Sequence, residues 1–363
     1  MAVRITKPAF NLREKISELD RPAGIIGSQV LKCNDLTELS KAVHTGRRNF
    51  IRNGAMEVWQ RGTSFTNIFN YTADRWQATR YNGTVNQITR NEMNGRIGDD
   101  YGFNWYLKYG FNGTGGGGVA ILNQPFESAD SKKLRGKPVC FSFYAKTSSH
   151  HAGKLFKSAI SWHTDTSHND DGMYYSNFRD ATTSKAYGYF HPNELWQRYW
   201  VTANIPYDVE QVGVMLIDAD YDNGSIDFTG CQLEIGNSPT PFEHLPYAEE
   251  LELCKRYYYK LDNAVGGQLR FVGYGGGGTT AGFVLNHRPP MRATPTGTVT
   301  ANTLSYNDGI AAYSGTGGWS FNGNRFGCDV NTSTNAGTNV IRGKGLSIYS
   351  GGTGTSIELN AEL

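Results

Sequence analysis

Residues 200–234 read WVTANIPYDVEQVGVMLIDADYDNGSIDFTGCQLE, and this stretch decides the fold class. Trp200 to Ile205 and Ser225 to Glu234 alternate apolar and polar side chains, the pattern of a strand with one buried face. Between them, Gln211 to Ile217 is a short apolar run bounded by turn-forming residues. Successive strands joined by turns predict antiparallel β-structure.

The same texture extends to both sides of this stretch. Val139 to Ala145 is another clear strand, and short strands recur between Gly, Asn and Asp residues from position 47 to 243. Many short strands separated by turns are typical of a jelly-roll β-sandwich. We therefore expect a mostly β protein with a central sandwich domain over residues 47–246.

Composition excludes several classes of protein. The 363 residues are 13% aromatic and 19% charged, with a net charge of +2, so the chain is not a highly charged disordered protein. The balanced charge argues against nucleic acid as the main partner. No apolar run is long enough to span a bilayer, and the N-terminus has no apolar segment of a secretory signal. We expect neither membrane insertion nor secretion by that route.

The cysteines are five, scattered, and without a C-x-x-C pair. They indicate neither a zinc site nor a disulfide framework, and we expect buried, reduced thiols. They are Cys33, Cys140, Cys231, Cys254 and Cys328.

Residues 1–46 differ from the rest of the chain. Apolar side chains recur there at helical spacing in two stretches, which predict two short helices, and the first helix should end at Arg21-Pro22. Two short helices cannot bury a core, so we interpret this segment as a docking segment or as the start of an oligomeric stem. The apolar positions of the first helix are Phe10, Leu12, Ile16 and Leu19.

Two further regions follow the sandwich. Leu251, Cys254, Tyr258 and Leu261 lie at helical spacing and predict a linking helix within residues 247–262. Residues 263–363 hold 21 of the 44 glycines and predict a small, Gly-rich β domain with long glycine loops. Its expected strands are Leu269 to Tyr274, Ala281 to Asn286, Gly297 to Leu304, Val340 to Arg342, and Leu346 to Tyr349.

Several aromatic residues of this last region lie among Gly, Asn and Ser. Aromatic rings in polar loops suit stacking on sugar rings, whereas in a small domain they also serve as core; both interpretations stay open. Trp319, in Gly317-Gly318-Trp319-Ser320, is the strongest candidate for an exposed ring. The candidate receptor-binding or glycan-binding residues are Trp319, Tyr313, Phe321, Tyr349 and Tyr274.

Patterns of catalysis and cofactor binding are weak. Gly113-x-Gly115-x-x-Gly118 and Gly273-x-Gly275-x-x-Gly278 match a dinucleotide fingerprint literally, but each lies in a glycine run without a following helix. The His- and Asp-rich segment 163–172 fits a solvated loop better than a known metal motif. We predict no catalytic residue, no metal and no cofactor.

Three stretches resemble tail-fibre and other virion appendage proteins of tailed bacteriophages. The first is NFIRNGAMEVWQRGTSF at 49–65, followed by YTADRW at 71–76. The second is QLEIGN at 232–237 with TPFE at 240–243, and the third is ELELCKRYYY at 250–259. Residues 7–19 are also similar to the start of such proteins, less specifically. Trp59, Trp76, Asp74 and Arg75 in the first stretch are interpreted as architectural: the indole N–H groups need partners, and the charged pair can fix a corner.

The resemblance implies a non-enzymatic fibre subunit on the virion, made in the host cytoplasm. Residues 1–46 would attach it to tail or other virion proteins through Phe10, Leu12, Ile16 and Leu19. The sandwich, similar to a carbohydrate-binding module, would form the body. Residues 263–363 would be the distal domain, which binds a host-surface glycan or protein. The subunit would form a homotrimer. A capsid- or neck-attached fibre without a receptor role, or a glycan-cleaving appendage, are the alternatives.

Overall fold

The computed structural model describes residues 47–362 except 68, 82–84, 95–101, 113–118, 165–183, 220–223, 263–268, 301–303, 308–311, 335–340 and 351–354. In this part of the chain β-strands dominate, which confirms the predicted fold class. No helix of the described residues has the length and apolar character of a membrane span.

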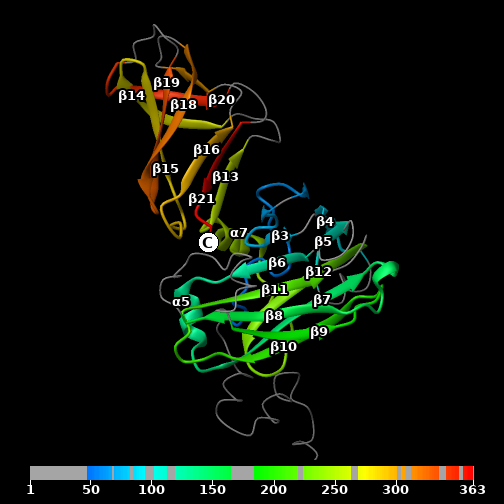
Figure 1. The fold of residues 1–363 in the computed structure, drawn as a ribbon. Coiled ribbons are helices and arrows are strands. Elements are labelled where there is room, and N and C mark those ends of the chain that lie inside the picture. The colour runs from blue at the N-terminus through cyan, green and yellow to red at the C-terminus, as the bar shows by residue number, and fades with distance from the viewer. Residues whose placement is uncertain are drawn as a thin grey trace, which may run out of the picture. The chain divides into compact units, whose positions relative to one another are not determined.

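A sandwich of two six-stranded antiparallel sheets follows residue 49. We name each sheet by a central strand. In order across the β12 sheet lie β1 (Ser64–Thr66), β4 (Val85–Glu92), β5 (Trp105–Asn112), β12 (Gly224–Ile235), β7 (Pro138–Thr147) and β10 (Gln197–Asn204). Across the β11 sheet lie β2 (Asn70–Tyr71), β3 (Gln77–Tyr81), β6 (Val119–Pro125), β11 (Gln211–Ala219), β8 (Phe156–His163) and β9 (Ser184–Phe190) (Figure 1).

The predicted sandwich strands are confirmed. Val139 to Ala145 lies in β7, Trp200 begins a stretch in β10, and the two later stretches are β11 and β12. Alternate residues of facing strands fill the space between the sheets with large side chains. The core contains, among others, Trp76, Tyr109, Phe143, Phe156 and Phe228.

Short helical segments connect the strands. They are α5 (Ser128–Ser131), the 3₁₀ segments η1 (Lys132–Leu134) and η2 (Ser149–His151), and α7 (Tyr247–Lys255). The predicted linking helix is therefore right only in its first part, because Tyr258–Asp262 forms strand β13. Its partner is a strand about a hundred residues later, at the C-terminus, which a local spacing pattern does not reveal.

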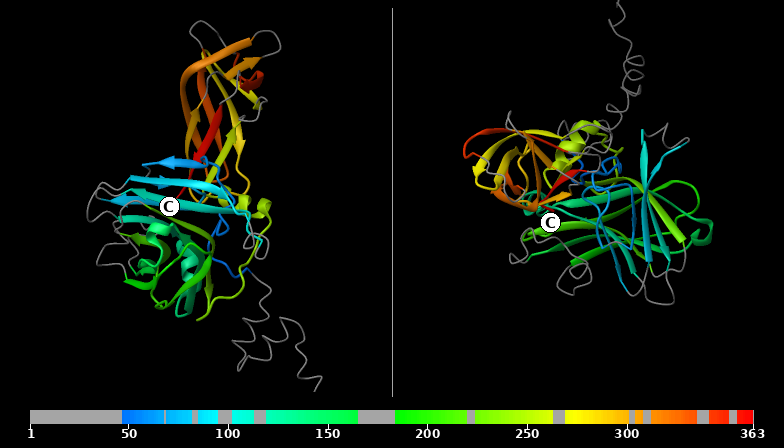
Figure 2. Two further views of the ribbon diagram at one scale, coloured as in Figure 1. Left: turned by 90° about the vertical axis from the view of Figure 1, so that its right-hand side faces the viewer. Right: turned by 90° about the horizontal axis from the view of Figure 1, so that it is seen from above.

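The C-terminal domain combines a three-stranded sheet with a closed six-stranded barrel (Figure 2). The sheet has the order β13, β21 (Ser356–Asn360) and β16 (Thr296–Thr300). The barrel runs through β14 (Arg270–Gly277), β15 (Thr280–Asn286), β19 (Gly327–Thr334), β18 (Ala312–Asn324), β17 (Leu304–Asn307) and β20 (Gly345–Ser350). One core spans both: Phe283, Val330 and Ile348 from the barrel, and Ile357 and Leu359 from the sheet.

The glycine runs of this domain differ from the prediction. Gly273 to Gly277 belong to β14, and 315–318 lie within β18, so these glycines are in strands instead of long loops. At Gly273 a Cβ would lie 2.4 Å from the Gly282 carbonyl oxygen and 2.3 Å from Ile348 Cδ1, so the strands approach too closely for a side chain.

Two smaller expectations are settled. Of the strand expected over Val340 to Arg342, the described residues Ile341 and Arg342 are not in a strand, whereas the other four predicted C-terminal stretches overlap β14, β15, β16 with β17, and β20. Cys140, Cys231, Cys254 and Cys328 are buried and free of disulfides, as predicted, and Cys33 lies outside the described residues.

Candidate functional site

The three stretches that carry the phage-fibre resemblance meet in the structure. Asn49 N donates to Glu243 Oε2 at 2.7 Å, which ties the first stretch to the second. Asn53 N donates to Glu250 Oε1 at 2.6 Å, which ties it to the third. A Cβ on Gly54 would lie 2.2 Å from the Cys231 carbonyl oxygen, so this glycine permits the close approach to β12. The motif residues therefore form one structural junction.

The indole groups of the first stretch are satisfied as expected. Trp59 Nε1 donates to the Met56 carbonyl at 2.7 Å, and Trp76 Nε1 donates to the Asn53 carbonyl at 3.0 Å. Both rings are buried in the sandwich core. These tryptophans stabilise the fold and are not available to a ligand.

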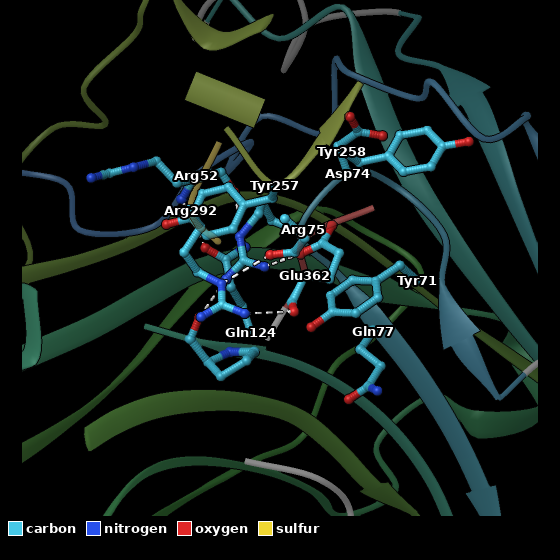
Figure 3. A network of polar contacts seen from close by, with 12 residues as sticks. Arg52, Tyr71, Asp74, Arg75, Gln77, Gln124, Tyr257, Tyr258, Arg292 and Glu362 are labelled. Carbon is cyan, nitrogen blue, oxygen red and sulfur yellow. Dashed lines mark hydrogen bonds and ion pairs between the residues drawn. The ribbon is translucent and has the colours of Figure 1, made fainter. Parts of the chain in front are cut away.

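The junction continues into a cluster that we call the clamp: Arg61, Arg75, Tyr257, Tyr258 and Glu362. Arg75 and Arg61 both bind the Glu362 carboxylate, Arg61 at 3.2 Å (Figure 3 shows Arg75). The Arg75 guanidinium lies 3.7 Å from the Tyr257 ring centroid, and that of Arg61 lies 3.6 Å from the Tyr258 ring. Two arginines of the sandwich thus hold the penultimate residue and two adjacent tyrosines of the chain's later part.

Burial and charge shift the pKa values around the clamp. Burial raises the pKa of Asp74 to about 6 although Arg61 and Gln60 favour its charged form. Burial lowers the pKa of Arg75, but the Glu362 carboxylate together with Tyr257 and Tyr71 outweighs this, so the net shift is upward. A carboxyl group with a shifted pKa is a mark of catalytic sites, but the Asp74 side chain is only 1% exposed, and the Glu362 side chain of the clamp is 4% exposed. No substrate reaches them in this conformation, and the clamp is structural.

A different surface has the features of a binding site: the β9 edge of the outer face of the β11 sheet. Leu122, Val214 and Ile160 point into the sandwich core, so their neighbours along each strand point outward. One row across this outer face consists of Gln77, Asn123, Met215, Ala159 and Tyr187 on successive strands. The first four of these side chains are buried, and only Tyr187, on the edge strand β9, is exposed.

Tyr187 and Tyr189 form an exposed aromatic pair at the β9 edge of this face. They are 42% and 61% exposed, and their ring centroids are 6.4 Å apart with the planes at 34°. Gly188 between them faces inward, where a Cβ would lie 2.7 Å from Val201 Cβ of β10. The glycine lets β9 pack closely on β10 while both tyrosines remain outside.

One group that can bind hydroxyls, Lys157, lies beside the tyrosine pair. Lys157 stands opposite Tyr189 in the register of β8 and β9. The Asn123–Gln77 pair (3.2 Å from Nδ2 to Oε1) and the His163–Gln211 pair (3.2 Å from Nε2 to Oε1) are buried, so they are closed to a ligand. Aromatic rings beside a lysine suit a sugar, which has apolar C–H faces and hydroxyl edges.

The tyrosine pair is not among the residues predicted from the sequence, although its signal is present there. Ala186-Tyr187-Gly188-Tyr189 alternates small and large side chains with a period of two, which places both tyrosines on one face. The core strand at 211–217 was found because its apolar run is continuous, whereas the outward-facing pair of β9 gives a shorter pattern.

The predicted aromatic residues of the C-terminal domain divide between the interior and the outer surface of the barrel. Trp319 and Phe321 are half-buried against the domain core, so the expected exposure of Trp319 is wrong. They lie in β18 and not in a loop, because this Gly-rich segment pairs with β19. Tyr274 and Tyr349 lie on strands whose neighbouring residues, Gly273 and Ile348, face the interior, so both point outward. The Tyr313 side chain lies outside the described residues.

The remaining predicted positions either lie outside the described residues or form no metal or phosphate site in the described part of the chain. The attachment residues Phe10, Leu12, Ile16 and Leu19 lie outside the described residues, as do Asp165, His168, Asp170 and Asp171. Within the described ranges no group of three or more His, Cys, Asp or Glu side chains is arranged to hold a metal ion. Gly273 to Gly277 form a strand, so the second dinucleotide-like match has no phosphate-binding helix.

No family model and no curated protein matches the sequence. Solved structures similar to the chain include the enzymatically active domain of tailspike protein 4 from bacteriophage CBA120. It is 12% identical with a TM-score of 0.34, and the match covers 52% of this chain and 21% of that one.

Carbohydrate-binding modules are among the other similar structures. The CBM22-1 xylan-binding domain of Paenibacillus barcinonensis Xyn10C is 12% identical, with a TM-score of 0.29, covering 48% of this chain and 95% of that one. The family 11 module of Clostridium thermocellum, in complex with a β-1,3-1,4-mixed-linked tetrasaccharide, is 10% identical, with a TM-score of 0.29, covering 49% and 98%.

Proposed function

We propose that the chain is a non-catalytic, glycan-binding subunit of a phage appendage. The observation that carries the glycan-binding part is the exposed pair Tyr187 and Tyr189 on the outer face of the β11 sheet. Two rings side by side, with Lys157 opposite one of them, offer stacking surfaces and a hydroxyl-binding group together. The appendage part is supported by the sequence resemblance at residues 49–76, 232–243 and 250–259.

In this proposal residues 1–46 attach the subunit to the virion, and the subunit is a homotrimer. Trimerisation brings three copies of a weak site to one host cell, so the binding strength rises through multivalency. A native mass near three times 40.1 kDa in size-exclusion chromatography with light scattering supports the trimer, and a monomer contradicts it.

Binding without cleavage is proposed because the strongly shifted carboxyl groups of the described residues are already engaged. Asp74 lies in the clamp region, and Asp227, 7% exposed, pairs with Lys146 at 3.6 Å. A glycosidase needs two accessible carboxyl groups about 5–9.5 Å apart on either side of the bond it breaks. Incubation with the polysaccharide that the chain binds should leave the polymer length unchanged.

The test of glycan binding is a polysaccharide array followed by titration calorimetry with the polymer retained best. The double variant Tyr187→Ala, Tyr189→Ala should lose at least about tenfold in affinity, since truncated aromatic anchors commonly cost more than about 1 kcal/mol each. Tyr247→Ala is the matched control, because Tyr247 is 54% exposed but lies in α7. Equal affinity of the double variant and the control would disprove the role of this face.

The position on the virion needs a separate test. Antibody against the chain should label the tail or its fibres in electron micrographs of the phage. Labelling of the capsid or neck, together with no retained polysaccharide, would instead support the structural fibre without a receptor role.

A further inference from the structure

The barrel carries a second aromatic surface of unusual construction at Tyr274. The Tyr274 hydroxyl donates to Asn331 Oδ1 at 3.1 Å, which links β14 to β19 across the intervening strand β15. The residue of β15 between them is Gly282. A Cβ there would lie 2.3 Å from Asn331 Oδ1 and 3.1 Å from the Tyr274 hydroxyl oxygen. The side chain of Tyr274 therefore reaches over a glycine, and Asn331 holds its far end.

This arrangement lies on the outside of the barrel. Phe283, Val330 and Ile348 belong to the interior core, and strand neighbours of these residues point the other way. The register places Tyr274, Gly282, Asn331 and Ser320 in one outward row across four strands. The adjacent row contains Val284, Asp329 and Asn322, and Val272 lies next to Val284 beyond the Gly273–Phe283 pair.

The two rows divide into an apolar half and a polar half. On the apolar half Val272 is 88% exposed and Val284 is 52% exposed, next to the Tyr274 ring. On the polar half β19 and β18 present Asp329, Asn331, Asn322 and Ser320, two amides, one hydroxyl and a single carboxylate. Apolar C–H groups on one side and hydroxyl partners on the other match the two sides of a neutral pyranose ring.

We infer that this barrel face is a second glycan-binding site, which takes a neutral hexopyranose unit of a surface polysaccharide. The sugar stacks on Tyr274, its C–H face also covers Val272 and Val284, and its hydroxyls bond to Asn322, Asn331 and Asp329. The inference rests on the proposed function, since it assigns the same class of ligand. It adds a site in the C-terminal domain that is independent of Tyr187 and Tyr189 in the sandwich.

Sugar fits the face better than a charged partner because the face offers one carboxylate and no lysine or arginine within the two rows. The hydrogen bond from Tyr274 to Asn331 fixes the ring before any ligand arrives. A ring that is already held loses little conformational freedom on binding, so preorganisation favours even a weak ligand.

Affinity electrophoresis of the full chain tests the inference. Native gels contain, one polymer at a time, galactomannan, xyloglucan, mixed-linkage β-glucan or dextran, and binding slows the chain. With a polymer that retards the parent chain, Tyr274→Ala should weaken retardation about fivefold or more in apparent affinity. Gly282→Ala should weaken it as well, because the new methyl group displaces Asn331 and the Tyr274 hydroxyl. Tyr274→Phe should retain most of the binding, because it keeps the ring.

Tyr247→Ala is the matched control, an exposed tyrosine in α7 and outside the barrel. Hydroxyl-radical footprinting gives a readout that does not depend on a variant: the peptide with Tyr274 should be protected by the polymer and the peptide with Tyr247 should not. Thermal unfolding of every variant checks that it folds.

Each outcome of these measurements supports or overturns the barrel site. Retardation unchanged by Tyr274→Ala but lost in the Tyr187→Ala, Tyr189→Ala variant would overturn the barrel site and leave the sandwich site standing. The reverse result would support the barrel site and remove the sandwich site. No retardation of the parent chain by any of the four polymers would overturn both for neutral glycans. A fall in native mass on Tyr274→Ala would show that a second copy covers this face, which also overturns the sugar site.

Discussion

The sandwich and the C-terminal domain bury their apolar faces by different means. The sandwich fills the space between its sheets with large rings such as Trp76, Tyr109 and Phe143. The C-terminal domain has a smaller hydrophobic core around Phe283, Val330 and Ile348. At Gly273 its strands approach so closely that no side chain fits. The sandwich therefore depends on buried area, which contributes about 25 cal/mol per Å², and the barrel depends on close backbone fit.

The two regions also differ in how they are anchored. The sandwich closes on itself through β1 to β12, whereas the C-terminal domain carries Glu362, whose carboxylate binds Arg61 and Arg75 of the sandwich. Within the C-terminal domain, the backbone carbonyls of Ala361 and Glu362 accept hydrogen bonds from Arg292 at 2.9 and 3.0 Å, which hold this end of the chain in position for the clamp. The last residues of the chain thus hold the domain to its neighbour, and the comparison predicts where each region is vulnerable.

The largest effect should come from breaking the clamp. Arg75→Met leaves the Glu362 carboxylate buried with one arginine instead of two and removes the bond from Arg75 Nη2 to the Pro125 carbonyl. Loss of one partner of a buried pair should lower the free energy of unfolding by about 3–5 kcal/mol. Urea unfolding followed by circular dichroism measures it. Lys255→Met, which breaks the exposed Lys255–Glu252 pair, should cost less than about 0.5 kcal/mol. Equal effects of the two changes would show that the clamp does not hold the domain.

The next effect compares two glycines of the barrel. Gly273→Ala places a methyl group against the Gly282 carbonyl and Ile348, and should lower the free energy of unfolding by about 1–3 kcal/mol. Gly318→Ala meets nothing within 4 Å, and should raise stability by about 0.4–1 kcal/mol because alanine restricts the unfolded chain. Differential scanning calorimetry of both variants measures the difference. Equal destabilisation would mean that the barrel needs glycine throughout and not only at close approaches.

The pH dependence should have opposite signs in the two regions. In the sandwich, burial raises the pKa of Asp227 to about 6 against the opposing effect of Lys146 and Lys108. A carboxyl group with a raised folded pKa contributes stability that is complete below its unfolded pKa and is lost as the pH rises through about 6. The parent chain should therefore gain on the order of 2 kcal/mol relative to Asp227→Asn between pH 7 and pH 4.5.

In the C-terminal domain the titrating group is His287. Burial lowers the pKa of His287, and neither ring nitrogen has a hydrogen-bond partner among the described residues. Its contribution to stability is complete above the unfolded pKa and is lost as the pH falls through and below the usual range near 6.5. The parent should lose stability relative to His287→Phe as the pH falls from 7.5 to 5. The unfolding temperatures of the parent and of both variants across this pH range measure the two effects. If the stability differences for Asp227→Asn and His287→Phe changed with pH in the same direction, the assigned protonation states would be contradicted.

The sequence predicts the sandwich better than the C-terminal domain, for a physical reason. Strands β7 and β10 to β12 alternate or run apolar over seven or more residues, so the local pattern is sufficient. In β18 the interior positions Trp319 and Phe321 follow a stretch of Ser, Gly and Thr, whose pattern resembles a loop. Only pairing with β19 makes this segment a strand, and Tyr258–Asp262 likewise becomes a strand only by pairing with β21.

The candidate sites show the same division. The charge of Arg75 in an aromatic stretch predicts that it pairs with a distant group, but its partner Glu362 lies almost 300 residues away. Tyr274 was predicted as a binding residue, and its outward position agrees with that role without testing it. Tyr187 and Tyr189 needed the sheet register, because an alternating strand does not say which of its faces meets the core.

The smallest effects should come from the exposed side chains of both regions. Tyr189→Ser in the sandwich and Val272→Ser in the barrel change residues that are 61% and 88% exposed, so each should alter the free energy of unfolding by less than about 0.5 kcal/mol. Urea unfolding at two protein concentrations a hundredfold apart measures both.

The comparison becomes sharper if the predicted homotrimer forms, because a neighbouring copy that packs on either face removes that face from water. A loss for Val272→Ser that grows on dilution would place the trimer contact on the barrel, and for Tyr189→Ser it would place the contact on the sandwich. Small, concentration-independent changes at both positions mean that both faces remain open to a ligand in the assembled state.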